Sequence, residues 1–581
     1  MVLRESGGVV VGIETAAVVP GDQIVDDLWI GVVVRQHASA VRAFVAEDVV
    51  VVEIGRAGVE VCASAVNAAS PERFKGHMML LADDLLAGRD TGSIGHDFAS
   101  LYIASELQKM GVAPAGEEGS YYQVVPFKQA TLDMSSPKMV VSDGDESFEF
   151  EFMQNMLMSA DINNETSSVS GELVFAGFGI DAPYLNYSDY ESIDLKGKIA
   201  VILSDRPHNF PSEEGSHFRR LIADSLVKSG AIGTIVVSTP TSEKVSPFEK
   251  RKLYVKTPST RWLTKEGEVH NGNPQLKGGA TLNLEAGKTL FEMAGIDLEE
   301  IFEKIENNES LTPRPMGLTA TLEKKSVHSE TTSPNVVGVI EGSDPELKNE
   351  FIILSAHSDH IGVSKNSVLK DKINNGAMDN ASGVTTLLEI AHEFHHAKEK
   401  PKRSVIFAFV TGEEKGLLGS EYYATYPTVP IDNIVANVNL DMPILTYRTN
   451  EIIAFGATHS SLEDTVSSTL LKNEMKLIED PMPEQAIFVR SDQYSFVKQG
   501  VPAVFLVPSL ATEVKDALAV SPQTFLAKHY HMPSDDLNLP IDYEWAAQFV
   551  EINYAIARDL ANAPERPAWN SDSFFSTLGK D

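Results

Sequence analysis

Residues 351–359 read FIILSAHSD, an apolar run that ends in a histidine and an aspartate. The same pattern returns at 404–414, SVIFAFVTGEE, and at 434–441, IVANVNLD. These short apolar runs predict buried strands, and a helical pattern over 383–398 separates the first from the second. The alternation predicts an α/β fold with a doubly wound, mostly parallel sheet flanked by helices. Because the carboxyl ends of parallel strands meet at one edge, the polar residues after these runs should lie together.

The chain before residue 325 has a different character. Apolar runs at 172–180, 197–203 and 233–238 are separated by Gly, Pro and Asn, and they predict a mainly β module. Apolar residues at helical spacing predict a helix over 97–110 that opens the first folded unit. We predict five parts: an accessory or poorly ordered extension (1–70), a first α/β part (71–138), the β module (139–324), a second α/β part (325–565) and a C-terminal tail (566–581).

Composition excludes several classes of function. The 581 residues carry 48 Lys and Arg against 82 Asp and Glu, a formal charge of −34, which repels nucleic-acid phosphates and anionic membrane surfaces. No apolar run reaches the roughly 18 residues of a membrane span, and the start, MVLRESGGVV, lacks the features of a secretory signal. The single cysteine, Cys62, excludes an internal disulfide and a cysteine-built metal site.

Histidines and acids at the predicted strand ends are candidate metal ligands. One of them alone would be an ordinary cap or surface group, but several brought to one sheet edge would repel one another without a cation. A pair of zinc ions resolves this repulsion, because zinc accepts both imidazole nitrogen and carboxylate oxygen. The candidates at strand ends are His357, Asp359, Glu413, Glu414 and Asp441. Asp379, in a Gly/Asn-rich turn just before a predicted helix, and His531, in YHMPSDD, complete the set.

Seven strings carry a family resemblance: LLAGRDTGS (85–93), SAHSDHIG (355–362), GAMDNASG (376–383), TGEEKGLLGS (411–420), NLDM (439–442), RSDQYSF (490–496) and YHMPSDD (530–536). With them the chain resembles the zinc aminopeptidases of metallopeptidase family twenty-eight, which are related to glutamate carboxypeptidase II, transferrin receptor and glutaminyl cyclase. The module at 139–324 resembles a protease-associated domain in DLKGKIAVIL and GAIGTIVVS. The resemblance implies that this module is inserted into the peptidase as a lid or recognition surface.

The resemblance also implies a role for each candidate residue. His357 and Asp441 would bind one zinc ion, Glu414 and His531 the other, and Asp379 would bridge the two. Glu413 would be the general base, and the Asp359 carboxylate would hold the His357 ring. Gln493 stands where many relatives carry histidine, so we do not count it as a ligand.

The implied activity is removal of N-terminal residues from peptides that have a free N-terminus. In this mechanism a metal-bridged water attacks the peptide carbonyl and Glu413 moves its proton. Two alternatives stay open, a glutaminyl cyclase-like enzyme and a non-catalytic, receptor-like protein with the same fold. The resemblance favours a secreted or periplasmic location, although no signal is visible at the start of the chain.

A second metal motif competes with this reading. HEFHH, residues 392–396, fits the H-E-x-x-H pattern of single-zinc proteases, in which Glu393 would be the base. The apolar face of this predicted helix instead leaves His392 and His396 beside Glu389 and Glu399 on the solvent side. The LLAGRDTGS string is equally well explained as a turn and helix N-cap.

Overall fold

The computed structural model describes residues 69–365, 369–516 and 518–579, together with the backbone of four short strands before residue 69. These strands are β1 (Val9–Val10), β2 (Val33–Val34), β3 (Val41–Ala46) and β4 (Val49–Ile54), and β3 pairs with β4 in antiparallel register. They lie in a compact unit, Met1–Ala68, separate from the unit Ala69–Asp581. Apart from these strands and residues 69 and 70, the prediction for 1–70 lies outside the described residues.

Four parallel strands form the centre of the main sheet, in the order β19 (Ser404–Val410), β18 (Phe351–His357), β20 (Ile434–Asn439) and β23 (Ala503–Pro508). Nearly every residue in them is buried, as expected for parallel strands covered on both faces. Antiparallel neighbours border them: β17 (Arg314–Ile340) on β19 and β21 (Glu451–Phe455) on β23. The parallel partner of β21 is β22 (Lys476–Ile478). The predicted mostly parallel α/β sheet is confirmed.

Helices cover both faces of this sheet. Ile352 and Leu354 of β18 face one apolar cluster, whereas Ile353 between them faces another, as the two-residue period of a strand requires. The first cluster includes residues of α1 (Pro71–Leu81), α2 (Ile94–Met110), α9 (Ser382–His396) and α14 (Tyr543–Asn562), and the second includes residues of α10 (Leu418–Thr425) and α12 (Gln493–Val497). Within the described residues, no helix combines the length and apolarity needed to cross a bilayer.

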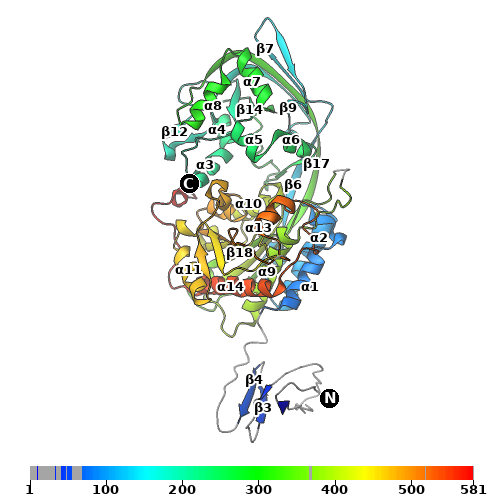
Figure 1. The fold of residues 1–581 in the computed structure, drawn as a ribbon, viewed down its shortest axis with the longest axis vertical. Helices are drawn as coiled ribbons and strands as arrows, with labels where there is room; N and C mark the ends of the chain where they lie inside the picture. Colours follow the sequence, from blue (N-terminus) through cyan, green and yellow to red (C-terminus); the bar gives the residue numbers. More distant parts are fainter. Residues whose placement is uncertain are drawn as a thin grey trace. The chain divides into compact units, whose positions relative to one another are not determined.

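One 27-residue strand joins the main sheet to the module at 139–324. The first half of β17 pairs with β10 (Thr166–Phe175) and β7 (Lys138–Ser142), and the second half pairs with β6 (Tyr122–Leu132). Figure 1 shows β17 as a long green ribbon running from the module into the main sheet. The two parts therefore share continuous backbone hydrogen bonding.

The module is a mixed α/β structure. Its parallel strands are β13 (Ile199–Leu203), β14 (Gly233–Val237) and β16 (Gly279–Leu282). Its helices are α3 (Ser212–Arg220), α4 (Ile222–Lys228), α5 (Pro240–Val245), α6 (Phe248–Arg251), α7 (Leu284–Met293) and α8 (Leu298–Glu306). The sequence predicted β13, β14 and the end of β10, but not β16 or the helices. Several of these helices are short, and a polar stretch such as SEEGSHFRR carries little apolar periodicity.

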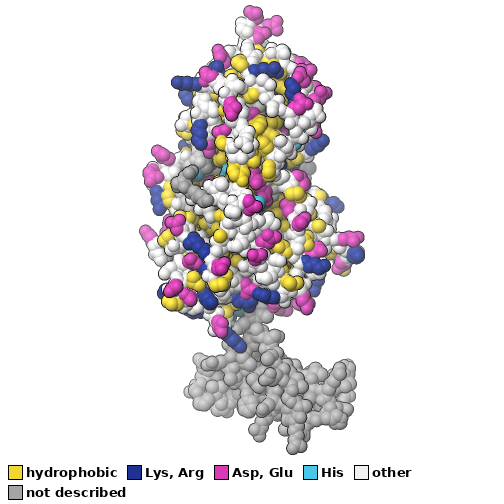
Figure 2. Space-filling model, turned by 90° about the vertical axis from the view of Figure 1, so that its left-hand side faces the viewer, with side chains coloured by type: hydrophobic (Ala, Val, Ile, Leu, Met, Phe, Trp, Pro, Cys, Tyr) yellow, Lys and Arg dark blue, Asp and Glu magenta, His cyan; other side chains and the backbone are white. Residues whose placement is uncertain are grey.

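The remaining elements are β5 (Ala113–Pro114), β8 (Ser147–Phe150), β9 (Met156–Leu157), β11 (Asp181–Ala182), β12 (Tyr187–Ser188), β15 (Ser259–Trp262), α11 (Leu462–Lys472) and α13 (Pro522–Lys528). The described part of the predicted C-terminal tail packs on the body of the protein. Phe574 and Phe575 are buried, and Trp569 Nε1 donates to the Gly500 carbonyl at 2.8 Å. Acidic side chains are scattered over the face drawn in Figure 2, in keeping with the charge of −34.

Candidate metal centre

The predicted site residues converge at the carboxyl edge of the parallel strands. His357 ends β18, Glu413 and Glu414 follow β19, and Asp441 follows β20. Asp379 lies in the turn at Ala377–Ala381 that leads into α9, and His531 follows α13. These side chains are spread over about 175 residues of sequence, and they meet because the carboxyl ends of the parallel strands lie at one edge of the sheet.

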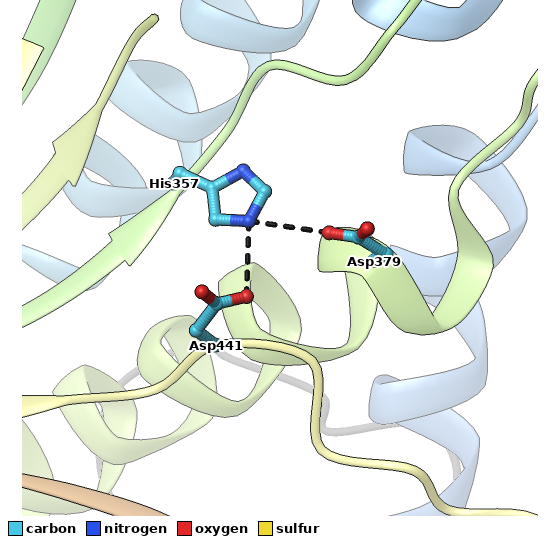
Figure 3. Close-up of side chains that lie close together, drawn as sticks. All are labelled: His357, Asp379 and Asp441. Atoms are coloured by element: carbon cyan, nitrogen blue, oxygen red, sulfur yellow. Dashed lines mark hydrogen bonds and ion pairs between the residues drawn. The ribbon is translucent and has the colours of Figure 1, made fainter. Parts of the chain in front are cut away.

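Asp379 lies between two histidines, one on each carboxylate oxygen. Its Oδ1 is 3.3 Å from His357 Nε2, which is also 3.0 Å from Asp441 Oδ1 (Figure 3). Its Oδ2 is 3.2 Å from His531 Nε2, which is also 3.2 Å from Glu414 Oε2. Two donor sets thus share one carboxylate.

These spacings fit zinc. A tetrahedral ion with bonds of about 2.0 to 2.2 Å places neighbouring ligand atoms about 3.3 to 3.6 Å apart. The four distances between histidine nitrogen and carboxylate oxygen, 3.0 to 3.3 Å, lie at or slightly below the short end of that range. The donor types, imidazole nitrogen and carboxylate oxygen, are those that zinc accepts.

The site concentrates negative charge away from water. Burial raises the pKa of Glu413 well above its ordinary value, and the charges of Asp441 and Glu414 raise it further against the opposing effect of His357. Burial also raises the pKa of Glu414, but His360 and His531 outweigh it and leave this pKa at about 2. Burial lowers the pKa of His531, yet Glu414 and Asp379 raise it to about 11. Such a carboxylate cluster needs cations, either protonated histidines or metal ions.

The Asp359 carboxylate has different partners from those predicted. His357 Nδ1 lies 3.1 Å from the Asp359 backbone carbonyl and 3.8 Å from its Oδ1. The carboxylate instead accepts from Thr91 Oγ1 at 2.8 Å and from the Glu413 backbone N–H at 3.2 Å. Main chain therefore orients the His357 ring, and the Asp359 side chain anchors the segment that carries Glu413.

Residues 335–557 match the model of peptidase family M28. This part of the chain belongs to peptidase family M28. A probable zinc metalloprotease of Pyrenophora teres f. teres is 40% identical over 111 residues, which are 18% of this chain and 22% of that protein. A vacuolar membrane protease of Saccharomyces cerevisiae is 34% identical over 106 residues, 18% of this chain and 9% of that protein. The matches thus span less than a quarter of these curated relatives.

Among solved structures, an aminopeptidase from Aneurinibacillus sp. strain AM-1 is similar to this chain. The two are 19% identical, with a TM-score of 0.49, and the similarity covers 87% of this chain and 97% of that one.

A buried arginine outside the M28 segment, which the sequence did not single out, holds the loops around the candidate site. Arg89, within LLAGRDTGS, donates to the carbonyls of Leu81 and Ser358, and also to those of Asn375 and Gly376 at 2.6 and 3.1 Å. Burial lowers its pKa only to about 10, so it stays cationic at neutral pH. The predicted N-cap is also present, since Ser93 Oγ accepts from the His96 N–H. The string therefore does more than turn the chain.

Three further polar residues around the M28 site were not predicted. Ser491 Oγ donates to Asp441 Oδ2 at 2.5 Å. Asp535 accepts from the backbone N–H groups of Met378 and Asp379 at 2.8 and 3.0 Å. His360 Nδ1 lies 2.6 Å from Glu414 Oε1. All three belong to quoted strings, Ser491 to RSDQYSF, Asp535 to YHMPSDD and His360 to SAHSDHIG, so membership of these strings was the available signal.

Gln493 takes part in a buried network in the M28 domain. Its Oε1 accepts from Asn439 Nδ2 at 2.9 Å, and its Nε2 donates to the Phe488 carbonyl at 2.6 Å. Both ends of the side chain amide therefore have protein partners, in keeping with its exclusion from the ligand set.

The HEFHH motif lies near the end of α9. The His392 and His396 rings stack at 4.1 Å, with His392 half-buried and His396 exposed. Neither histidine belongs to a metal-capable cluster in the part of the chain that the structure describes. The predicted position of Glu389 on the solvent side is wrong: it is buried and pairs with Arg73 at 2.9 Å and His77 at 3.3 Å. The pairing explains how a glutamate is tolerated on the inner face.

Replacing both His392 and His396 with alanine is expected to leave activity within a few-fold of the parent and zinc content unchanged. The two side chains contact Arg73 and each other rather than the predicted ligands. Metal analysis and initial rates on one preparation test this. Zinc loss from the double variant would restore the single-zinc motif as the metal site.

Proposed function

We propose that the protein is a dizinc aminopeptidase that removes N-terminal residues from peptides. The observation that carries this proposal is the placement of Asp379, whose two oxygens face separate histidine–carboxylate sets next to Glu413. A carboxylate shared in this way is the natural bridge of a two-metal hydrolytic site. Membership of residues 335–557 in peptidase family M28 supports the same reaction class.

We assign the roles as follows. His357 and Asp441 would hold one zinc ion, Glu414 and His531 would hold the other, and Asp379 would serve both. Bound zinc would supply Lewis acidity, which polarises a carbonyl and lowers the pKa of water.

Glu413 accepts the proton of the attacking water on its carboxylate and returns it to the leaving amine nitrogen. Burial and the charges of Asp441 and Glu414 raise the pKa of Glu413, which favours holding the proton between its removal from water and its delivery to the amine. Asp359 helps to position Glu413, since its carboxylate accepts a hydrogen bond from the Glu413 backbone N–H.

We also propose that the module at 139–324, a protease-associated domain by resemblance, contributes to substrate recognition. Its Trp262, on β15, donates Nε1–H to Glu421 Oε2 at 3.1 Å. Glu421 lies on α10, which follows the segment carrying Glu413 and Glu414. The module therefore packs beside the proposed catalytic segment.

The decisive test compares a short peptide that has a free N-terminus with its N-acetylated form. We expect cleavage at the first peptide bond of the free peptide and a rate at least about 100-fold lower for the acetylated one, because acetylation removes the amine lone pair and displaces the scissile bond. Mass spectrometry identifies the bond that breaks.

Each other outcome of this test points to a different function. Equal cleavage of both peptides, or cuts in the interior, contradicts the aminopeptidase proposal. Ammonia release from N-terminal Gln peptides indicates glutaminyl cyclase chemistry. Two bound zinc ions without turnover of any peptide indicate the receptor-like alternative. The secreted or periplasmic location stays a prediction.

A further inference from the structure

His360 is a buried histidine beside the proposed metal site, and none of the roles assigned above uses it. Its side chain has no exposed surface. Its Nδ1 lies 2.6 Å from Glu414 Oε1 and 3.9 Å from Asp379 Oδ2. Its Nε2 is buried without a hydrogen-bond partner among the described residues. The ring therefore makes one strong polar contact, and that contact is with Glu414.

His360, Asp379 and Glu414 form one of two groups among the described residues that could hold a metal ion. The contact between His360 Nδ1 and Glu414 Oε1, at 2.6 Å, is nevertheless shorter than the 3.0 to 3.3 Å of the proposed ligand pairs and than the edge of a zinc tetrahedron, about 3.3 to 3.6 Å. It is the distance of a charge-assisted hydrogen bond, which favours a role as hydrogen-bond partner of Glu414. His360 thus contacts the oxygen of Glu414 that does not face His531.

The surroundings prevent the His360 ring from swinging away. Gly376 packs against it so closely that an added Cβ would lie 2.7 Å from the ring atoms Cδ2 and Cγ. The His360 backbone N–H donates to the Arg89 carbonyl at 3.1 Å. The imidazole is therefore a fixed donor rather than a mobile side chain.

We propose that His360 is a positioning residue that makes Glu414 a one-oxygen ligand. Its Nδ1–H occupies Oε1, so only Oε2, which lies 3.2 Å from His531 Nε2, is directed to the second zinc ion. A glutamate without this hydrogen bond would be free to bind zinc through both oxygens and fill a coordination position that substrate needs. This inference rests on the proposed dizinc site.

A matched pair of variants tests the role of the Nδ1–H group. Asparagine and leucine have nearly the same shape, but in His360→Asn the amide Nδ2 takes the place of the ring Nδ1, whereas His360→Leu has no donor. Isothermal titration of the metal-free full chain with zinc gives the affinity of each site. Cobalt(II) absorption spectra report coordination number, since higher coordination weakens the visible bands.

We expect His360→Asn to bind both zinc ions within a few-fold of the parent. His360→Leu should bind the second ion about 10 to 100-fold more weakly, the usual effect of losing the partner of a metal ligand, with the first site unchanged. Its cobalt spectrum should weaken, and kcat should fall more than KM rises. Melting of the metal-free forms checks folding, and His360→Ala replaces the leucine variant if that one does not fold.

Two outcomes overturn the proposal. Equal loss of zinc in His360→Asn and His360→Leu makes His360 a ligand, and unchanged zinc binding and spectra in His360→Leu leave it no role at the metal. Failure of the dizinc proposal itself looks different, because the parent chain would then bind fewer than two zinc ions.

Discussion

Glu413→Gln is expected to lower kcat by about 10² to 10⁴-fold while zinc content and substrate affinity stay close to those of the parent. Glutamine has the shape of glutamate, but its amide cannot accept the proton of the attacking water. None of the four distances within the proposed ligand set involves the Glu413 carboxylate. The zinc ligands should therefore be unaffected by the substitution. Steady-state kinetics and metal analysis of one preparation measure both effects.

The adjacent residue supplies the control for this variant. Glu414→Gln makes the same chemical change one position along, but Glu414 Oε2 faces His531 and the second metal position. It should therefore lose zinc from that position, whereas Glu413→Gln should not. Normal turnover by Glu413→Gln would refute its assignment as the base.

Asp379→Asn is expected to reduce binding at both zinc positions by at least about 100-fold. Asparagine keeps one oxygen and no charge, so it is a poor bridge between the histidine–carboxylate sets that Asp379 Oδ1 and Oδ2 now face. Calorimetric titration of metal-free protein measures the affinities. Zinc at 100 times its dissociation constant stabilises a fold by about 2.7 kcal/mol per site, so the rise in melting temperature on adding zinc should also shrink.

Asp97→Asn is the matched control, because Asp97 is an exposed residue in the first turn of α2. It should bind zinc like the parent. Undiminished binding of two zinc ions by Asp379→Asn would show that the bridge has been misplaced.

Strand positions were predictable because they depend on local patterns, whereas the order of the strands in the sheet came only from the structure. Runs such as FIILSAH and SVIFAFV are almost entirely apolar because both faces of β18 and β19 are covered. This feature can be recognised from the sequence without knowledge of any tertiary contact. The convergence of His357, Glu414 and Asp441 followed from the rule that parallel strands end at one edge.

The details of support around the site were not predictable in this way. Asp379 and His531 lie on turns whose position relative to the strands has no periodicity, so the sequence named them as candidates but only the family resemblance gave them roles. In the inserted module, short polar helices such as α3 carry little apolar periodicity, whereas α8 has apolar residues at helical spacing that the sequence prediction overlooked.

The hydrogen bonds that hold the site residues in place could not be predicted either, because they join distant parts of the sequence. These contacts depend on loops that meet across more than 50 residues of sequence. Examples are the hydrogen bonds from Arg89 to the Ser358 carbonyl, from the Glu413 N–H to Asp359, and between His360 and Glu414. An apolar run in the sequence determines that its residues are buried, because burial of a strand depends on its own composition. A buried polar group acquires its role only from the partner that the tertiary structure places within about 3 Å, since hydrogen bonds are short and directional.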